Sequence, residues 1–309
     1  MGLGPPVLAL YCQLKGLGVF EGITDVMELG AQNVWCPRAG LVKNLFKAFG
    51  KAEPPADMLE RFANWKGSGF ELYTALGFTY RCIDLDPQFN SIPLDLNFDP
   101  CPPEHVGKYG FVTNHGTSEH ILNQYNVFKV VHDLTMAGGF ILHAVPFTVH
   151  LEHGFFNYQP NFFEALSRYN SYEVSGIWVG PGWQMASFIP WEPSLLDYLV
   201  LNAQTTHLLV ALLQKKYDKP FCVPFQGVYE AVTNERHLAR YAMVVDGELY
   251  DGKRIKYISR ERVVAERVEQ ETRIFQSELA AAHAKALSGI SGRELLNELG
   301  KRIRRRVIG

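Results

Sequence analysis

The sequence predicts an α/β protein whose core is a mostly parallel sheet, and three observations predict it. Short apolar runs recur along the first two thirds of the 309 residues. Helical patterns lie between several of these runs, and such alternation is typical of a parallel sheet with helices on both faces. Several runs also end in a carboxylate or a small polar residue, at the positions where ligands bind in sheets of this kind.

The apolar runs predict seven strands. In chain order they cover residues 23–29, 78–83, 92–94, 109–113, 139–145, 173–179 and 207–213. The spacing of apolar residues predicts a helix around Leu72 and Leu76, before the second strand, and another over residues 121–136. Thr117 or Ser118 is the predicted N-cap of that second helix.

Three regions follow from this pattern. They are a helical N-terminal lead-in over residues 1–22, a core domain over 23–225 and a largely helical C-terminal extension over 226–309. Pro54-Pro55 lies in an insertion at about residues 33–66, between the first two strands. The extension is strongly charged from about residue 259, and a solvated helix is its favoured interpretation. A packing surface for a second copy, and hence a homo-oligomer, is the alternative.

Composition argues against several classes of function. The net charge is −2, which creates no field that attracts nucleic acid or an anionic membrane. The N-terminus lacks the pattern of a signal peptide, and no apolar stretch reaches the ~20 residues that span a bilayer. The five cysteines include no CxxC pair, as expected of reduced thiols. We therefore expect a soluble, cytoplasmic protein with neither a nucleic-acid nor a membrane partner.

Carboxylates stand at the ends of three successive predicted strands, at Glu28, Asp84 and Asp95. Each of the aspartates taken alone is explained as a turn former, and Asp86 competes with Asp84. As an ordered set they suit a nucleoside ligand, because an acid after the second strand accepts the ribose hydroxyls in dinucleotide folds. An acid after the third strand can accept an adenine amino N–H, and Gly30 lets a ligand approach the backbone.

Together with these carboxylates, five stretches carry a resemblance to class I S-adenosylmethionine-dependent methyltransferases over residues 23–180, about half of the chain. They are DVMELGAQ (25–32), YRCIDLDP (80–87), IPLDLNFDP (92–100), YGFVTNHGTSEHILNQ (109–124) and AGGFILHAVPF (137–147). With HGFFNYQP (153–160), the set resembles a bacterial small-molecule branch that has a TNxGTSEH stretch. The resemblance implies a Rossmann-like class I methyltransferase sheet with helical N-terminal and C-terminal additions.

The resemblance also implies a cofactor, S-adenosyl-L-methionine, with S-adenosyl-L-homocysteine as product, and a small-molecule acceptor in specialised metabolism. The cofactor-binding residues that it implies are Glu28, Gly30, Gln32, Asp84, Leu85, Asp95, Leu96, Asn114, Gly116 and Thr117. One position departs from the family pattern, because Gln32 stands where the first motif has a second glycine. Gln32 is therefore predicted to hydrogen-bond the methionine part of the cofactor.

Four residues are candidates for catalysis, because the loops after the fourth and fifth strands should overlook the transferred methyl group. They are His115, Glu119, His120 and His153. An imidazole can take a proton from the acceptor near neutral pH, although each of the four is also explained as a core or capping residue. A metal built on His143, His150 and His153 is disfavoured, because no HExxH pattern accompanies them, so no metal site is predicted.

Two other functions remain open. An NAD(P)-dependent oxidoreductase shares the sheet and the ribose acid, but it needs GxGxxG against a pyrophosphate, and ELGAQN has one glycine. A catalytically silent cofactor-binding or scaffold protein is favoured by Gln32. The sequence identifies neither the acceptor nor the atom that is methylated.

Overall fold

The computed structural model describes residues 2–181, 188–195, 199, 205–226, 244–245 and 248–249. All of them belong to the first of the two compact units into which the chain divides, Met1–Ile255 and Lys256–Gly309. The charged helix predicted from about residue 259 lies outside the described residues, as does nearly all of the predicted extension over 226–309. Among the described residues, no helix has both the length and the apolarity to cross a membrane.

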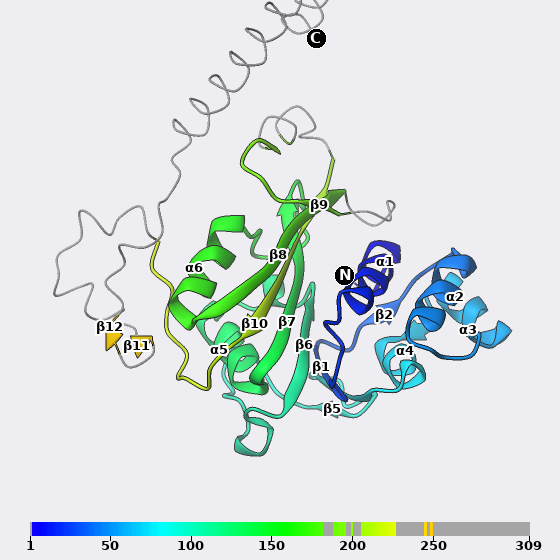
Figure 1. Ribbon diagram of the computed structural model, residues 1–309, viewed down its shortest axis with the longest axis horizontal. Coiled ribbons are helices and arrows are strands. Elements are labelled where there is room, and N and C mark those ends of the chain that lie inside the picture. The colour runs from blue at the N-terminus through cyan, green and yellow to red at the C-terminus, as the bar shows by residue number, and fades with distance from the viewer. Residues whose placement is uncertain are drawn as a thin grey trace, which may run out of the picture. The chain divides into compact units, whose positions relative to one another are not determined.

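An eight-stranded sheet forms the centre of the described unit (Figure 1). Its strands are β1 (Asp25–Leu29), β4 (Thr79–Ile83), β5 (Ser91–Ile92), β6 (Tyr109–His115), β7 (Thr135–Thr148), β8 (Tyr172–Pro181), β9 (Ile189–Pro190) and β10 (His207–Lys215). They are ordered β5-β4-β1-β6-β7-β10-β8-β9. Each of the seven predicted strands is present, and the first five strands of this order run parallel. The predicted Rossmann-like, mostly parallel sheet is therefore confirmed.

Two strands run against the parallel core, β10 and the short edge strand β9, which pairs antiparallel with β8. β10 pairs antiparallel with both β7 and β8, so that Leu212 lies opposite Leu142 on one side and Gly176 on the other. In the dinucleotide-binding order, the sixth strand lies beside the fifth. In this sheet the fifth and sixth strands in chain order are β7 and β8, and β10 lies between them. Residues 207–213 are all buried, and a strand that is apolar on both faces carries no sequence signal of its direction.

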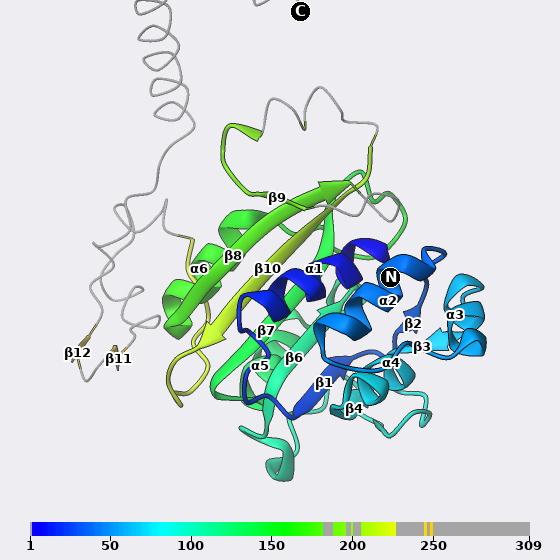
Figure 2. The ribbon, with the colours of Figure 1, turned by 45° about the vertical axis from the view of Figure 1, so that its right-hand side comes forward.

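Helices cover both faces of the sheet (Figures 1 and 2). On one face lie α1 (Pro5–Gly16), α2 (Ala39–Ala48), α3 (Ala56–Ala63) and α4 (Gly69–Leu76), and on the other lie α5 (Gln124–Leu134) and α6 (Pro160–Asn170). A hydrophobic core lies on each face of the sheet. Alternate residues of a strand pack into the two cores, because successive side chains of a strand point to opposite faces. Along β10, Val210 packs into the core beneath α1–α4, whereas Leu209 and Ala211 pack into the core beneath α5 and α6.

The segment between β1 and β4 leaves the core and returns to it. Its two ends pair as the antiparallel strands β2 (Asn33–Val34) and β3 (Gly67–Ser68), and the N–H of Gly69 donates to Gln32 O at 2.7 Å. The helix α4 therefore begins beside the loop that follows β1, although α2 and α3 intervene in the chain. Leu3 joins the same ladder, since its N–H donates to Asn33 O at 2.8 Å.

The start of α5 differs from the prediction. Neither Thr117 nor Ser118 caps it, because residues 118–120 form a separate short 3-10 helix, η2 (Ser118–His120). The N-cap is Asn123, whose side chain accepts the N–H of Asn126 at 3.1 Å. The remaining elements are η1 (Pro103–His105), β11 (Val244–Val245) and β12 (Glu248–Leu249).

Candidate active site

The predicted site residues follow the carboxyl ends of parallel strands, which meet at one edge of the sheet. β1, β4, β6 and β7 are parallel neighbours or near neighbours in this sheet. Their order reverses between β1 and β6, because the chain moves from β1 to β4 on one side and to β6 on the other. Ligands in open α/β sheets bind in the crevice at such a switch point, so this edge is the candidate active site.

Glu28, at the end of β1, is fully buried beneath this edge. Its Oε2 accepts a hydrogen bond from the Tyr80 hydroxyl at 2.7 Å and another from the Gln32 N–H at 3.1 Å. Burial raises the pKa of the Glu28 carboxyl to about 8. These contacts direct Glu28 to the backbone of the loop after β1 and to Tyr80 on β4.

The loop after β1 is closed by contacts with the loop after β6. Thr117 Oγ1 donates to Leu29 O at 2.6 Å, and the Gln32 side-chain amide donates to Thr117 Oγ1 at 3.1 Å and to Leu29 O at 3.3 Å. Gly30 lies between them with a φ of 71°, a conformation that glycine adopts without strain. Gln32, where the family pattern has glycine, thus fills the space above Gly30 and uses its amide N–H groups within the protein.

Asp84, at the end of β4, connects two strand ends. Its Oδ2 accepts the N–H of Ala31 at 2.7 Å, and its Oδ1 accepts the N–H of Asp86 at 3.0 Å. Asp84 is half-buried, whereas Asp86 is exposed and accepts the side-chain amide of Gln88. Leu85, between the two acids, is 67% exposed. A carboxylate can accept about four hydrogen bonds, so Asp84 retains acceptor capacity beside the β1 loop.

Asp95 and Leu96 follow the short strand β5. Asp95 Oδ1 accepts the N–H of Asn97 at 2.9 Å, as in an Asx turn, and the Asp95 N–H donates to Asp99 Oδ2 at 2.8 Å. Asp95 is half-buried. Leu96 is buried in the core beneath α5 and α6, so its side chain belongs to the packing of the sheet.

Asn114 holds the turn after β6. Its Oδ1 accepts the N–H groups of Thr117 at 3.3 Å and Ser118 at 3.1 Å, and its Nδ2 donates to Ser118 Oγ at 2.8 Å. Gly116 occupies the turn with a φ of 77°. The Tyr158 hydroxyl is hydrogen-bonded to Ser118 Oγ at 2.9 Å, and sequence reasoning missed this residue. The HGFFNYQP stretch could have indicated Tyr158, because the hydroxyl group of a tyrosine in an apolar run needs a hydrogen-bond partner when it is buried.

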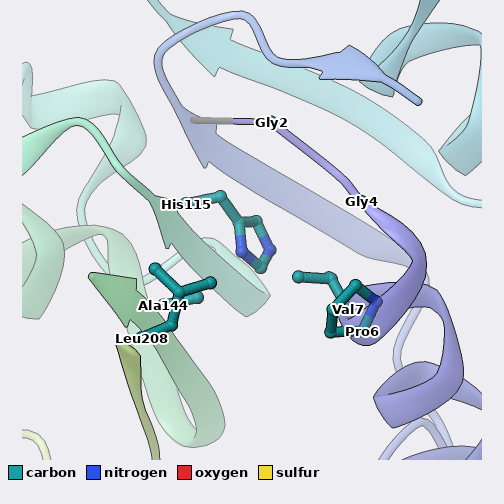
Figure 3. A pocket seen from close by; sticks show the side chains of 7 residues that line it. All are labelled: Gly2, Gly4, Pro6, Val7, His115, Ala144 and Leu208. Carbon is teal, nitrogen blue, oxygen red and sulfur yellow. The ribbon is translucent and has the colours of Figure 1, made fainter. Parts of the chain in front are cut away.

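His115 lies at the end of β6 beneath the N-terminal segment. Its Nε2 is 2.8 Å from the Tyr11 hydroxyl, and Figure 3 shows its imidazole directed toward Pro6 and Val7. A small, mainly apolar pocket is lined there by Gly2, Gly4, Pro6, Val7, His115, Ala144 and Leu208. Burial lowers the pKa of His115 to about 3, so the ring is neutral at neutral pH.

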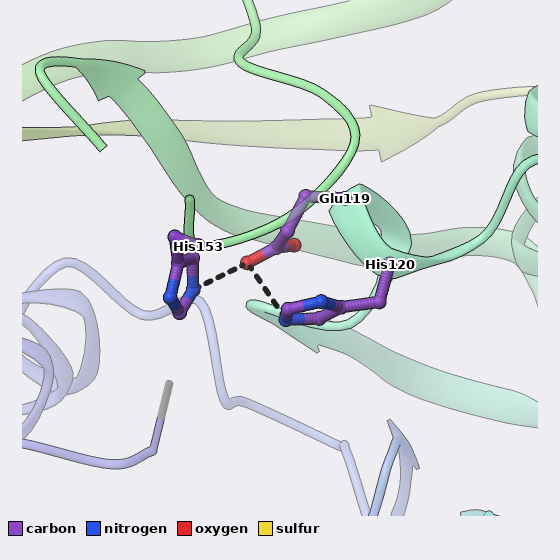
Figure 4. A group of neighbouring side chains, drawn as sticks. All are labelled: Glu119, His120 and His153. Atoms are coloured by element: carbon purple, nitrogen blue, oxygen red, sulfur yellow. Dashed lines mark ion pairs between the residues drawn. The ribbon is translucent and has the colours of Figure 1, made fainter. Parts of the chain in front are cut away.

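The other three predicted catalytic residues form one cluster (Figure 4). Glu119 and His120 come from η2, and His153 comes from the loop after β7. His153 Nε2 lies 3.4 Å from Glu119 Oε1, and His120 Nε2 lies 3.9 Å from the same oxygen. The loop is held against η2 because the N–H of Phe155 donates to Glu119 O at 2.8 Å. His115 is not part of this cluster.

The cluster combines a buried acid with two accessible imidazoles. The Glu119 side chain is 0% exposed, whereas the side chains of His120 and His153 are 44% and 32% exposed. Within the part of the chain that the structure describes, neither carboxyl oxygen of Glu119 has a hydrogen-bond partner. Burial raises the pKa of Glu119 to about 7, and burial lowers the pKa values of His120 and His153.

Comparison with known proteins shows similarity in structure only. No model of a protein family matches the sequence, and no curated protein matches it. A SAM-dependent methyltransferase from Archaeoglobus fulgidus aligns with 66% of this chain and 92% of its own, at 10% identity and a TM-score of 0.33. The 1,6-didemethyltoxoflavin-N1-methyltransferase of Burkholderia thailandensis aligns with 68% of this chain and 78% of its own, at 10% identity and a TM-score of 0.36. Similarity at these scores carries no conclusion about the reaction.

Proposed function

We propose that this protein transfers a methyl group from S-adenosyl-L-methionine to a small-molecule acceptor, in specialised metabolism. The observation that carries the proposal is the contact between Asp84 Oδ2 and the N–H of Ala31 at 2.7 Å. It joins an acid at the end of the second core strand to the loop after the first, beside the switch point. An acid in this position binds the ribose of a nucleoside ligand in Rossmann-like folds.

Several of the other predicted residues follow neighbouring strands at this edge, where each would contact a different part of the cofactor. Gly30 and Thr117 meet at the end of the loop where the methionine part would lie. Asp84 would accept the ribose hydroxyls, and Asp95 would accept the adenine amino group. Leu85 is largely exposed beside Asp84, and an adenine ring would cover part of this apolar side chain.

The same loop argues against a nicotinamide cofactor. A pyrophosphate binds to the free N–H groups of a helix that starts directly after the loop. Here the loop continues into β2, and the next helix in the chain, α2, begins only at Ala39. The helix that does begin beside the loop is α4, and the N–H of its first residue, Gly69, already donates to Gln32 O.

The acceptor would approach from the side of β6 and β7. We assign the loss of its proton to the cluster of Glu119, His120 and His153, whose two imidazoles are accessible to solvent. His115 is neutral and bonded to Tyr11, so we assign it to the wall of the apolar pocket beside Val7. Methyl transfer needs an in-line approach to the sulfonium, which a shaped pocket promotes by alignment.

A catalytically silent cofactor-binding protein is the second candidate, and Gln32 favours it. Its side chain fills the space above Gly30 and bonds to Thr117 and Leu29. In a silent protein the cofactor would bind without turnover of any acceptor. Cofactor affinity and acceptor turnover are therefore measured separately.

The test is a calorimetric titration with S-adenosyl-L-homocysteine of the wild type, Asp84→Asn and the matched control Asp86→Asn. We expect the wild type to bind, and Asp84→Asn to weaken binding tenfold or more, because hydrogen bonds to a charged group are worth ~1.5–3 kcal/mol. Asp86→Asn should stay within about twofold, since the Asp86 side chain is exposed and accepts a hydrogen bond from Gln88. Absent binding, or a preference for NADH over S-adenosyl-L-homocysteine, would contradict the proposal.

A further inference from the structure

The carboxyl group of Glu119 is buried beside the imidazoles of His120 and His153, at ion-pair distances of 3.9 Å and 3.4 Å. Neither of its oxygens accepts a hydrogen bond among the described residues, and the buried His153 Nε2 beside them makes none. Nearly all buried polar groups in folded proteins have hydrogen-bond partners, because an unpaired group loses its hydration without replacement. Three such atoms close to one another indicate a missing partner that all three can bind.

The distances between these donor atoms suit a metal ion. His153 Nε2 and Glu119 Oε1 are 3.4 Å apart, and two ligands bound at about 2.1 Å in a tetrahedron are separated by about 3.4 Å. His120 Nε2 is 3.9 Å from the same oxygen, and the donor atoms of the three residues all lie within 4.8 Å of one another. His120 is exposed, so its side chain has room to rotate toward the other two donors.

The donor types narrow the choice of ion. Imidazole nitrogens select zinc and its first-row neighbours, whereas Mg²⁺ and Ca²⁺ prefer oxygen ligands alone. Two histidines with one glutamate are the ligand set of several catalytic zinc sites, in which a water or a substrate completes the coordination. The side chains of His120 and His153 are 44% and 32% exposed, so this end of the cluster lies near the protein surface.

We propose that Glu119, His120 and His153 bind one divalent ion of the zinc class, with an open position for a hydroxyl group of the methyl acceptor. The role in methyl transfer rests on the proposed function, whereas the metal site itself does not. A hydroxyl bound to such an ion is more acidic than in water. Its proton leaves to solvent, an oxygen lone pair forms the bond to the methyl carbon, and the electron pair of the broken carbon–sulfur bond returns to sulfur. The charge of the ion does not change.

The test is a titration of untagged, chelator-stripped protein with Co²⁺, followed by its visible absorption, and then competition with Zn²⁺. The variants are Glu119→Gln and His153→Asn. The matched control is His105→Asn, because His105 precedes β6 at the opposite edge of the sheet and contacts Tyr109. We expect one ion per chain, a dissociation constant at least tenfold higher in both variants, and a change below about twofold in the control.

Two results would overturn the metal site. One is the absence of saturable binding to the wild type, and the other is undiminished binding in both variants. A substitution at a buried residue can unfold the chain, so His120→Asn is a third variant, because the His120 side chain is 44% exposed. His120→Asn should weaken Co²⁺ binding to the same degree as the other two variants. S-adenosyl-L-homocysteine is titrated into the stripped protein separately, so failure of the methyl-donor proposal is seen independently of failure of the metal site.

Discussion

Glu28 and Tyr80 meet on neighbouring strands, where the tyrosine hydroxyl donates to the buried carboxyl at 2.7 Å. The second carboxyl oxygen of Glu28, Oε1, has no hydrogen-bond partner among the described residues. A proton on that oxygen removes the cost of burying a charge, which is why burial raises the pKa of Glu28 to about 8. Because of this raised pKa, the contribution of Glu28 to the stability of the protein depends on pH.

The first prediction concerns this dependence. Between the ordinary pKa of 4.5 and the folded pKa of about 8, the native state holds a proton that the unfolded state has lost. The contribution of Glu28 to the free energy of unfolding is thus full below the lower value, falls as pH rises through this window and levels off above it. The fall is at most ~1.4 kcal/mol per pH unit.

Urea unfolding from about pH 5 to about pH 8.5 measures it. The free energy of unfolding of the wild type minus that of Glu28→Gln should fall with this slope, because glutamine cannot titrate. Glu104→Gln, in the exposed η1, is the matched control and should keep the wild-type slope. The raised pKa of Glu119 adds a slope to both proteins alike, so a difference between wild type and Glu28→Gln that does not change with pH would contradict the prediction.

The second prediction concerns Gly30, whose φ of 71° brings it against Thr117 and Gln32. A Cβ at this position would lie 2.5 Å from Thr117 Oγ1 and 2.9 Å from Gln32 Nε2. Gly30→Ala therefore adds a steric clash to the ~1–2 kcal/mol strain of a left-handed alanine. We expect a loss of ~2–4 kcal/mol in the free energy of unfolding.

Gly22→Ala provides the control for backbone strain alone. Gly22 has a φ of 70°, and a Cβ there would have no atom within 4 Å. The free energy of unfolding should fall by ~1–2 kcal/mol in Gly22→Ala. The difference between the two variants then measures the contact with Thr117. Equal losses would mean that the loops after β1 and β6 separate without cost.

The elements that the sequence predicted are those with a local signal. β1, β4 and β6 are short apolar runs that end in Gly30, Asp84 and Asn114, and these endings mark the edge of the sheet. The antiparallel direction of β10 has no such signal, because both of its faces are buried and only its neighbours define its direction. The start of α5 was predicted at the wrong polar residue, since Ser118 is engaged by Asn114 and Tyr158 and Asn123 caps the helix.

The sequence predicted individual catalytic candidates, but it did not predict which of them lie together in the structure. Glu119, His120 and His153 were all proposed for catalysis, yet nothing local shows that Glu119 is fully buried. The loop after β7 packs directly against it at Gly154, where a Cβ would lie 2.9 Å from Glu119 Cγ. Such close packing between a turn and a loop distant in sequence is a tertiary contact, which neither periodicity nor spacing encodes. The sequence disfavoured a metal on His143, His150 and His153, and the structure groups His153 instead with Glu119 and His120.

The third prediction concerns Tyr158, whose hydroxyl lies between the turn after β6 and the first residue of α5. It donates to Gln124 Oε1 at 2.7 Å, and it shares a second hydrogen bond with Ser118 Oγ at 2.9 Å, in which the serine hydroxyl can supply the proton. Tyr158→Phe keeps the ring in the core and removes both hydrogen bonds. We expect the free energy of unfolding to fall by ~1–3 kcal/mol, because partly buried polar atoms lose their donor.

Two measurements separate this effect from a general loss of packing. Urea unfolding compares Tyr158→Phe with Tyr125→Phe, a matched control whose side chain is 52% exposed and whose change should stay within ~0.5 kcal/mol. Amide hydrogen exchange then follows Thr117 and Ser118, whose N–H groups donate to Asn114 Oδ1. Faster exchange at these two amides in Tyr158→Phe alone would show that the tyrosine stabilises the turn that carries Glu119. Unchanged exchange would mean that Asn114 holds the turn without it.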